Sequence, residues 1–125
     1  MTKNILLVDD EELITKSLAK LLNSKGYSAT IASSGHQALE KAQEVDFDLV
    51  VSDVRMPDMN GIETVRSLLL YFKKKKNRTV PGIIIITGYA DKDAFEQARD
   101  LQIKAFLHKP FEMDTFLQLV KKIIG

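Results

Sequence analysis

Short apolar runs alternate with amphipathic segments five times along this chain of 125 residues. The runs are bounded by acids, glycines or hydroxyl residues, as buried strands are, and the segments between them repeat apolar residues at helical spacing. Because each strand is followed by a helix, the pattern predicts an α/β fold with a parallel sheet and helices on both faces. Strands are predicted at residues 5–8, 27–32, 49–52, 82–86 and 105–108, and helices at about 11–25, 34–45, 62 to the lysines at 73, 91–101 and 112–124.

The length suits a single domain, residues 1–125, and the composition excludes several kinds of chemistry. No cysteine is present, so disulfides, thiolate catalysis and cysteine-based metal sites are excluded. The two histidines, His36 and His108, are too few for a histidine metal cage, and we expect His108 to be an ordinary strand residue. No apolar run is long enough to span a membrane, and the N-terminus lacks a signal-peptide core. We therefore expect a cytoplasmic protein.

Positive charge gathers at one place although the formal net charge is only +1. The rest of the chain is mildly acidic, which argues against a general polyanion-binding surface and against direct binding of nucleic acid by this domain. The basic tract itself is either a solvated extension of the third helix or a contact for an acidic partner or a nucleic-acid backbone. It consists of Lys73, Lys74, Lys75, Lys76 and Arg78.

Four of the five predicted strands end in side chains that can carry chemistry. Asp9 and Asp10 follow the first strand, Asp53 the third, Thr87 the fourth and Lys109 the fifth. Because ligands bind at the carboxyl ends of the strands in parallel sheets of this kind, we expect these groups to meet at one edge. Asp10 is also a candidate cap for the first helix, and the two roles compete for its oxygens.

Three carboxylates at one edge repel one another, so without a cation at least one should have a raised pKa. A hard divalent ion relieves this repulsion, and Mg²⁺ suits a site with few protein ligands and several waters, with Mn²⁺ as the other possibility. With a lysine ammonium and a hydroxyl nearby, the groups indicate phosphoryl transfer to a carboxylate. No GxxxxGK[ST] loop occurs, so nucleotide binding is not indicated.

Four segments carry a family resemblance and occur in register with the strand–helix pattern. They are LLVDDE at 6–11, DVRMPDMNG at 53–61, ITGYAD at 86–91 and FLHKPF at 106–111. Over its whole length, the chain resembles the receiver domain of two-component response regulators. We therefore expect a doubly wound, five-stranded parallel sheet in the flavodoxin-like order 2-1-3-4-5.

The resemblance implies a role for each residue at the predicted edge. Asp53 matches the phosphoacceptor, Asp10 the acid that contacts Mg²⁺ directly, and Asp9 the acid that helps to hold the ion, often through water. The backbone carbonyl of Arg55 would be a further metal ligand. Thr87 and Lys109 would bind phosphoryl oxygens.

The resemblance also assigns residues around that centre. Phe106 stands at the aromatic switch position, where tyrosine is common, and lacks the hydroxyl. Arg55 and Tyr89 stand where side chains tune the lifetime of the acyl phosphate, and we expect this bulky pair to slow hydrolysis. The remaining residues are structural: Pro57 and Gly61 shape the loop after Asp53, and Pro110 matches a residue that usually follows a cis peptide bond.

These assignments predict a phosphoacceptor switch rather than a turnover enzyme, with self-phosphorylation from a donor and autodephosphorylation as its only reactions. The expected partner is a sensor histidine kinase or a histidine phosphotransfer protein. The output face would combine the fourth helix, the fifth strand and the last helix, and it would serve a homodimer or an effector domain. The last helix is apolar over a wide arc, which fits such a face as well as it fits a frayed terminus.

Two other functions remain open at this point. One is a pseudo-receiver, a binding module that keeps the fold and is never phosphorylated; the complete set of acids, threonine and lysine argues against it. The other is a phosphohydrolase with an aspartyl-phosphate intermediate. Such enzymes usually carry a second acid two residues after the nucleophile, where this chain has Arg55.

Overall fold

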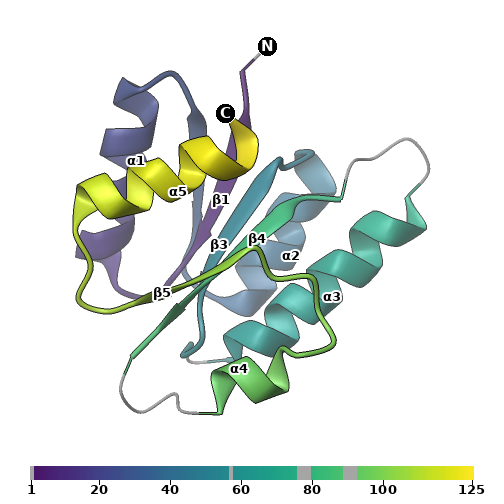
Figure 1. Ribbon diagram of the computed structural model, residues 1–125. Coiled ribbons are helices and arrows are strands. Elements are labelled where there is room, and N and C mark those ends of the chain that lie inside the picture. Colours follow the sequence, from purple (N-terminus) through teal and green to yellow (C-terminus); the bar gives the residue numbers. More distant parts are fainter. Residues whose placement is uncertain (1, 57, 76–79, 89–92) are drawn as a thin grey trace.

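A computed structural model describes residues 2–56, 58–75, 80–88 and 93–125, and within them the predicted sheet is confirmed. Its five strands are parallel and lie in the order β2-β1-β3-β4-β5 (Figure 1). The strands are β1 (Asn4–Val8), β2 (Ser28–Ala32), β3 (Leu49–Asp53), β4 (Gly82–Thr87) and β5 (Ala105–His108). The helices are α1 (Glu12–Ser24), α2 (Gly35–Glu44), α3 (Gly61–Lys74), α4 (Ala94–Gln97) and α5 (Met113–Ile124).

Helices cover both faces of the sheet, with α1 and α5 on one face and α2, α3 and α4 on the other (Figure 1). Successive residues of a strand point to opposite faces. Ile5 and Leu7 of β1 therefore pack toward α1 and α5, whereas Leu6 and Val8 pack toward α2 and α3. All four are at most 1% exposed. Burial on both faces explains why these strands are unbroken apolar runs in the sequence.

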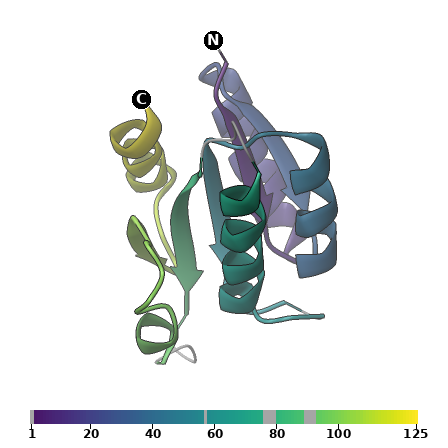
Figure 2. The ribbon, with the colours of Figure 1, turned by 90° about the vertical axis from the view of Figure 1, so that its right-hand side faces the viewer.

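The start of β1 and the end of α5 lie at the same end of the sheet in both views (Figures 1 and 2). The carboxyl ends of all strands therefore lie at the other end. Side-chain hydrogen bonds and one glycine define the ends of several helices. The Ser34 hydroxyl accepts the Gln37 N–H at the start of α2, and the Asn60 carboxamide oxygen accepts the Ile62 N–H at the start of α3. Gly26, with φ +92°, directly follows the C-cap residue Lys25 of α1 in the left-handed conformation that glycine favours.

The helix predicted at about 91–101 is wrong in length, because α4 spans only Ala94–Gln97 in the described residues. Arg66 of α3 donates hydrogen bonds to the Gln97 carbonyl and to the Asp100 carboxylate. In a longer helix the Leu101 N–H would bond to the Gln97 carbonyl, but it bonds to the Ala98 carbonyl instead. The Gln97 carbonyl therefore accepts from Arg66 of α3 and not from the Leu101 amide, where the helix ends.

The apolar side chains at α4 differ in burial. Ala94 and Ala98 are buried under the sheet, at 3% and 2% exposure, but Phe95 is 63% exposed. Its ring lies 5.3 Å from the ring of Phe106 on β5. Phe95 therefore forms part of the surface and covers a neighbouring strand residue.

The wide apolar arc of α5 is used mainly for the core. Phe116, Leu117 and Val120 are buried against the sheet, and Leu119 and Ile123 are partly buried against the same cluster. The helix continues to Ile124. In the part of the chain that the structure describes, no helix has both the length and the apolar character required to cross a bilayer.

The Arg66 contact predicts a local effect on α4. Replacing Arg66 with Ala should increase hydrogen exchange at the Gln97 and Ala98 amides, because the helix loses its anchor to α3. Two-dimensional NMR exchange would measure this. Arg99→Ala is the matched control, since among the described residues the Arg99 side chain pairs with exposed Glu96 of α4 and does not contact α3. Equal exchange in the two variants would contradict the anchoring role.

Candidate functional site

The carboxyl edge of the sheet brings together the charged residues that the sequence placed at strand ends. Asp9 directly follows β1, Asp53 is the last residue of β3, and Lys109 directly follows β5. In the pairing register Asp53 lies opposite Ile86, one residue before Thr87 at the end of β4. The Lys109 ammonium lies 3.1 Å from an Asp53 carboxylate oxygen.

Asp9, Asp10 and Asp53 form a cluster in which one carboxylate oxygen from each lies within 4.8 Å of the others. Asp9 and Asp53 are buried, at 3% and 5% exposure, and Asp10 is exposed. One Asp9 oxygen accepts the Glu11 N–H at 3.0 Å, and the other accepts no hydrogen bond in the described residues. Asp10 does not cap α1, because Glu11 occupies the cap position and makes no side-chain cap bond.

Lys109 is the cation nearest to this cluster among the described residues. Besides Asp53, its ammonium contacts a Glu11 carboxylate oxygen at 2.7 Å and the second Asp9 oxygen at 3.5 Å. Partial burial lowers the pKa of Lys109, but the hydrogen bonds to Glu11 and Asp53 outweigh that effect and hold the pKa above its ordinary value. The ammonium is therefore always charged, and its single positive charge contacts three carboxylates.

The pKa of the buried Asp9 carboxyl is raised by its surroundings. Burial raises its pKa from 3.8 to about 6, and the Asp53 charge adds to the rise, whereas the Glu11 N–H and the Lys109 charge oppose it. A bare, buried carboxylate oxygen beside two further carboxylates matches the needs of a hard divalent cation that binds oxygen ligands. Asp9, Asp10 and Asp53 are thus the residues that fit Mg²⁺ or Mn²⁺.

The loop after Asp53 is held close to the strand by Gly61. The Gly61 N–H donates to the Val54 carbonyl at 2.7 Å. A Cβ at Gly61 would overlap the Asp53 carbonyl oxygen and would lie 2.7 Å from the Asp53 carbonyl carbon. Only glycine allows this approach, so the residue helps to place the Asp53 backbone.

Asp58 ties the same loop to the start of α2. Its carboxylate accepts the backbone N–H groups of Gly35 and His36, each at 3.0 Å, and also contacts the His36 ring. These bonds, the one from His36 first, hold the pKa of Asp58 well below its usual range. Arg55, in the same loop, is exposed. Pro57, expected to shape this loop, lies outside the described residues.

Around Lys109 the structure adds contacts that sequence reasoning did not find. The Lys109–Pro110 peptide bond is cis, the geometry that the family resemblance implied. Glu11 was not expected to pair with Lys109, and no spacing signal links residues so far apart in the chain. His108, expected to be an ordinary strand residue, places its Nδ1 2.9 Å from the Thr87 hydroxyl. Tyr89 lies outside the described residues.

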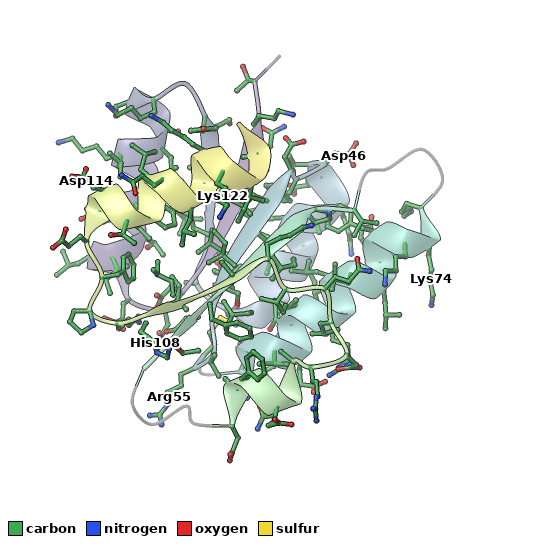
Figure 3. All side chains as sticks on the ribbon, in the orientation of Figure 1. Asp46, Arg55, Lys74, His108, Asp114 and Lys122 are labelled. Atoms are coloured by element: carbon green, nitrogen blue, oxygen red, sulfur yellow. The ribbon has the colours of Figure 1, made fainter. Side chains whose placement is uncertain are left out.

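Phe106 lies on the face of β5 that α4 covers and is half-buried there. Figure 3 shows His108 and Arg55 at the same end of the molecule, whereas Asp46 lies at the opposite end of the sheet. The structure therefore gathers acids, ammonium, hydroxyl and aromatic ring at one end. A doubly wound parallel sheet with such an acidic edge defines a class of small signalling domains.

Comparisons with known proteins agree with that class. The chain matches the response regulator receiver domain over residues 5–121. It is 30% identical over 125 residues to the polar-differentiation response regulator DivK of Brucella ovis, covering 100% of this chain and 98% of DivK. It is 35% identical over 122 residues to the transcriptional regulatory protein ZraR of Escherichia coli, covering 98% of this chain and 26% of ZraR.

Solved structures give the same result. A CheY-like receiver domain from Methanospirillum hungatei superposes with a TM-score of 0.87 at 27% identity, covering 98% of this chain and 93% of that one. The response regulator TrrA from Thermotoga maritima, in complex with Mg(2+)-BeF, gives a TM-score of 0.79 at 32% identity, covering 98% and 99%. This chain belongs to the response regulator receiver domain family of two-component signal transduction.

The raised pKa of Asp9 predicts how the stability of the metal-free chain depends on pH. A carboxyl that binds its proton more tightly when folded favours folding below its unfolded pKa of 3.8. That contribution is lost as the pH rises through about 6. Asp9→Asn should therefore stabilise the metal-free chain by about 3 kcal/mol at pH 7.5 and by little at pH 4.

Urea unfolding in the presence of a chelator would measure this difference. Glu40→Gln, on the exposed side of α2, is the control and should change stability little at either pH. A destabilising effect of Asp9→Asn at pH 7.5 would contradict the electrostatic account of the cluster.

Proposed function

We propose that this receiver domain is a phosphoacceptor switch in which Asp53 takes a phosphoryl group from a phosphohistidine. The observation that carries the proposal is the placement of the buried Asp53 carboxylate 3.1 Å from the Lys109 ammonium and within the acidic cluster of Asp9 and Asp10. Membership of the family supports it, since receiver domains bind Mg²⁺ at their acidic pocket and are typically not classical enzymes. Residues 1–125 would form the receiver domain that carries this switch.

The proposed reaction joins the phosphorus to a carboxylate oxygen of Asp53 while the bond between phosphorus and the donor imidazole nitrogen breaks. Asp9, Asp10, Asp53 and the backbone carbonyl of Arg55 would hold the ion. Bound Mg²⁺ supplies charge neutralisation for the phosphoryl oxygens. Lys109 then exchanges its contact with the bare Asp53 carboxylate for one with a phosphoryl oxygen.

The remaining residues of the proposed switch act after transfer. Thr87 would donate its hydroxyl hydrogen to a phosphoryl oxygen, and Phe106 would repack. This would bias the equilibrium of the α4-β5-α5 face toward an active conformation for a homodimer or an effector domain. A sensor histidine kinase or a histidine phosphotransfer protein would supply the phosphoryl group. Hydrolysis would return the domain to its resting state.

The assignment of Asp53 is tested by phosphorylation with acetyl phosphate. Incubation with Mg²⁺ should add one phosphoryl group, detected by intact-mass spectrometry, and a chelator should abolish the addition. Asp53→Asn should prevent it, because the amide is a poor nucleophile. Asp46→Asn is a matched control at the opposite end of the sheet and should leave labelling unchanged (Figure 3).

Each alternative result has a clear meaning. Labelling that persists in Asp53→Asn would refute this residue as the acceptor. A wild-type chain that takes no phosphoryl group from acetyl phosphate or from a phosphorylated histidine domain would instead be a pseudo-receiver. Continuous phosphate release with many turnovers would indicate a phosphohydrolase, which Arg55 in place of a second acid argues against.

We further propose that Arg55 and Tyr89 extend the lifetime of the acyl phosphate by shielding it from water. For Tyr89 the support is the family resemblance alone. Arg55→Ala and Tyr89→Ala should each accelerate dephosphorylation of the purified phosphoprotein severalfold, measured by the decay of the phosphorylated mass after removal of the donor. Met59→Ala, in the same loop as Arg55, is the control. Unchanged decay rates in both test variants would remove the shielding hypothesis.

A further inference from the structure

The hydroxyl of Thr87 already has a partner in the unphosphorylated chain. Thr87 is 3% exposed at the end of β4, and its Oγ1 lies 2.9 Å from Nδ1 of His108. The two residues are opposite each other in the pairing of β4 with β5. The Lys109 N–H donates to the Thr87 carbonyl at 2.8 Å, which holds this register at the end of the strands. The contact thus results from the backbone pairing of two neighbouring strands.

The chemistry of this contact sets up a competition. A hydroxyl group has a single hydrogen to donate, and a neutral imidazole that carries its hydrogen on Nε2 accepts at Nδ1. The oxygens of a phosphoryl dianion only accept hydrogen bonds. Thr87 therefore cannot donate to His108 and to a phosphoryl group on Asp53 at the same time. His108 is exposed, so water can satisfy its Nε2–H while Nδ1 accepts from Thr87.

We propose that His108 is a positioning residue that holds the Thr87 hydroxyl in the resting chain and competes with the phosphoryl group for it. The inference rests on the proposed function, in which Thr87 binds a phosphoryl group carried by Asp53. His108 then sets how much binding free energy is needed to move Thr87 into its phosphoryl-bound position. A chain without this acceptor switches more readily at the same occupancy of Asp53.

Three other roles of His108 predict different behaviour. A residue that only packs against Thr87 would have the same effect whether or not the hydroxyl is present. A side chain that attracts the phosphoryl group directly by charge would weaken binding when removed. A residue that only maintains the strand end would change stability and leave ligand affinity unaltered. The affinity of the chain for a phosphoryl mimic separates these roles from competition for the hydroxyl.

The test is calorimetric titration with beryllofluoride in the presence of Mg²⁺. His108→Ala should bind beryllofluoride about fivefold more tightly than the wild type, as expected for release from one competing hydrogen bond. His108→Asn should stay close to the wild type, because its amide oxygen can take the place of Nδ1 as acceptor. Glu40→Gln, on the exposed side of α2, is the control and should have no effect.

A double-mutant cycle shows whether His108 acts through Thr87. Thr87→Val removes the hydroxyl and should weaken beryllofluoride binding, and adding His108→Ala to it should then change affinity by less than about 1.5-fold. An equal gain from His108→Ala in both backgrounds would overturn the inference. Unchanged or weaker binding by the single His108→Ala variant would also overturn it. Amide NMR spectra of each variant check that the fold is kept.

A spectroscopic signature tests the resting contact directly. Imidazole ¹⁵N NMR of the free chain should show His108 with its hydrogen on Nε2 and with Nδ1 as acceptor, and beryllofluoride should remove the acceptor signature. A resting tautomer with hydrogen on Nδ1 would overturn the inference. Failure of the wild type to bind beryllofluoride at all would refute the proposed function, which is a different result from an unaltered affinity in His108→Ala.

Discussion

The burial of Asp9 and Asp53 beside a single ammonium is the interaction on which the rest of this domain depends. Two carboxylates that are at most 5% exposed would be costly in most proteins, and here Lys109 compensates only in part. The raised pKa of Asp9 expresses the remaining cost. The core tolerates this cost because strands β1, β3 and β4 are buried on both faces and hold the sheet rigidly behind the edge. The buried carboxylates therefore lower the stability of the metal-free chain and form a site that favours a bound cation.

The elements around the edge are attached to one another by a few specific bonds. Asp58 connects the loop after Asp53 to α2, and Gly61 brings that loop against the strand. Arg66 connects α3 to α4. These bonds fasten the loop and the short helix without burying them deeply. Under the proposed function, a change in charge at Asp53 would act on a loop and a short helix that these few side-chain bonds attach to the rest of the domain, which suits a two-state response.

Most of the sheet could be predicted from the sequence because its signal is local and strong. Runs of apolar residues bounded by polar ones placed β5 at its observed limits and placed β3 and β4 to within one residue. The meeting of the acids and the lysine at one edge could be predicted because all strands of a parallel sheet end at the same edge. The length of α4 could not be predicted, since its end coincides with a contact from α3, where the Gln97 carbonyl accepts from Arg66 and the Leu101 amide bonds to Ala98. Glu11 and His108 were missed because their contacts depend on rotamers and on a pairing register that no sequence spacing records.

The register of β4 with β5 also links the site to the face beneath α4. Thr87 lies opposite His108, and Ile85 lies opposite Phe106, two residues earlier on each strand. Residues two apart on a strand share a face, so His108 and Phe106 both lie on the side that α4 covers, where Phe95 contacts Phe106. Under the proposed function, a hydroxyl that leaves His108 would free the same strand face on which the ring of Phe106 would repack. Release of Thr87 and repacking of Phe106 would then be two parts of one event on β5.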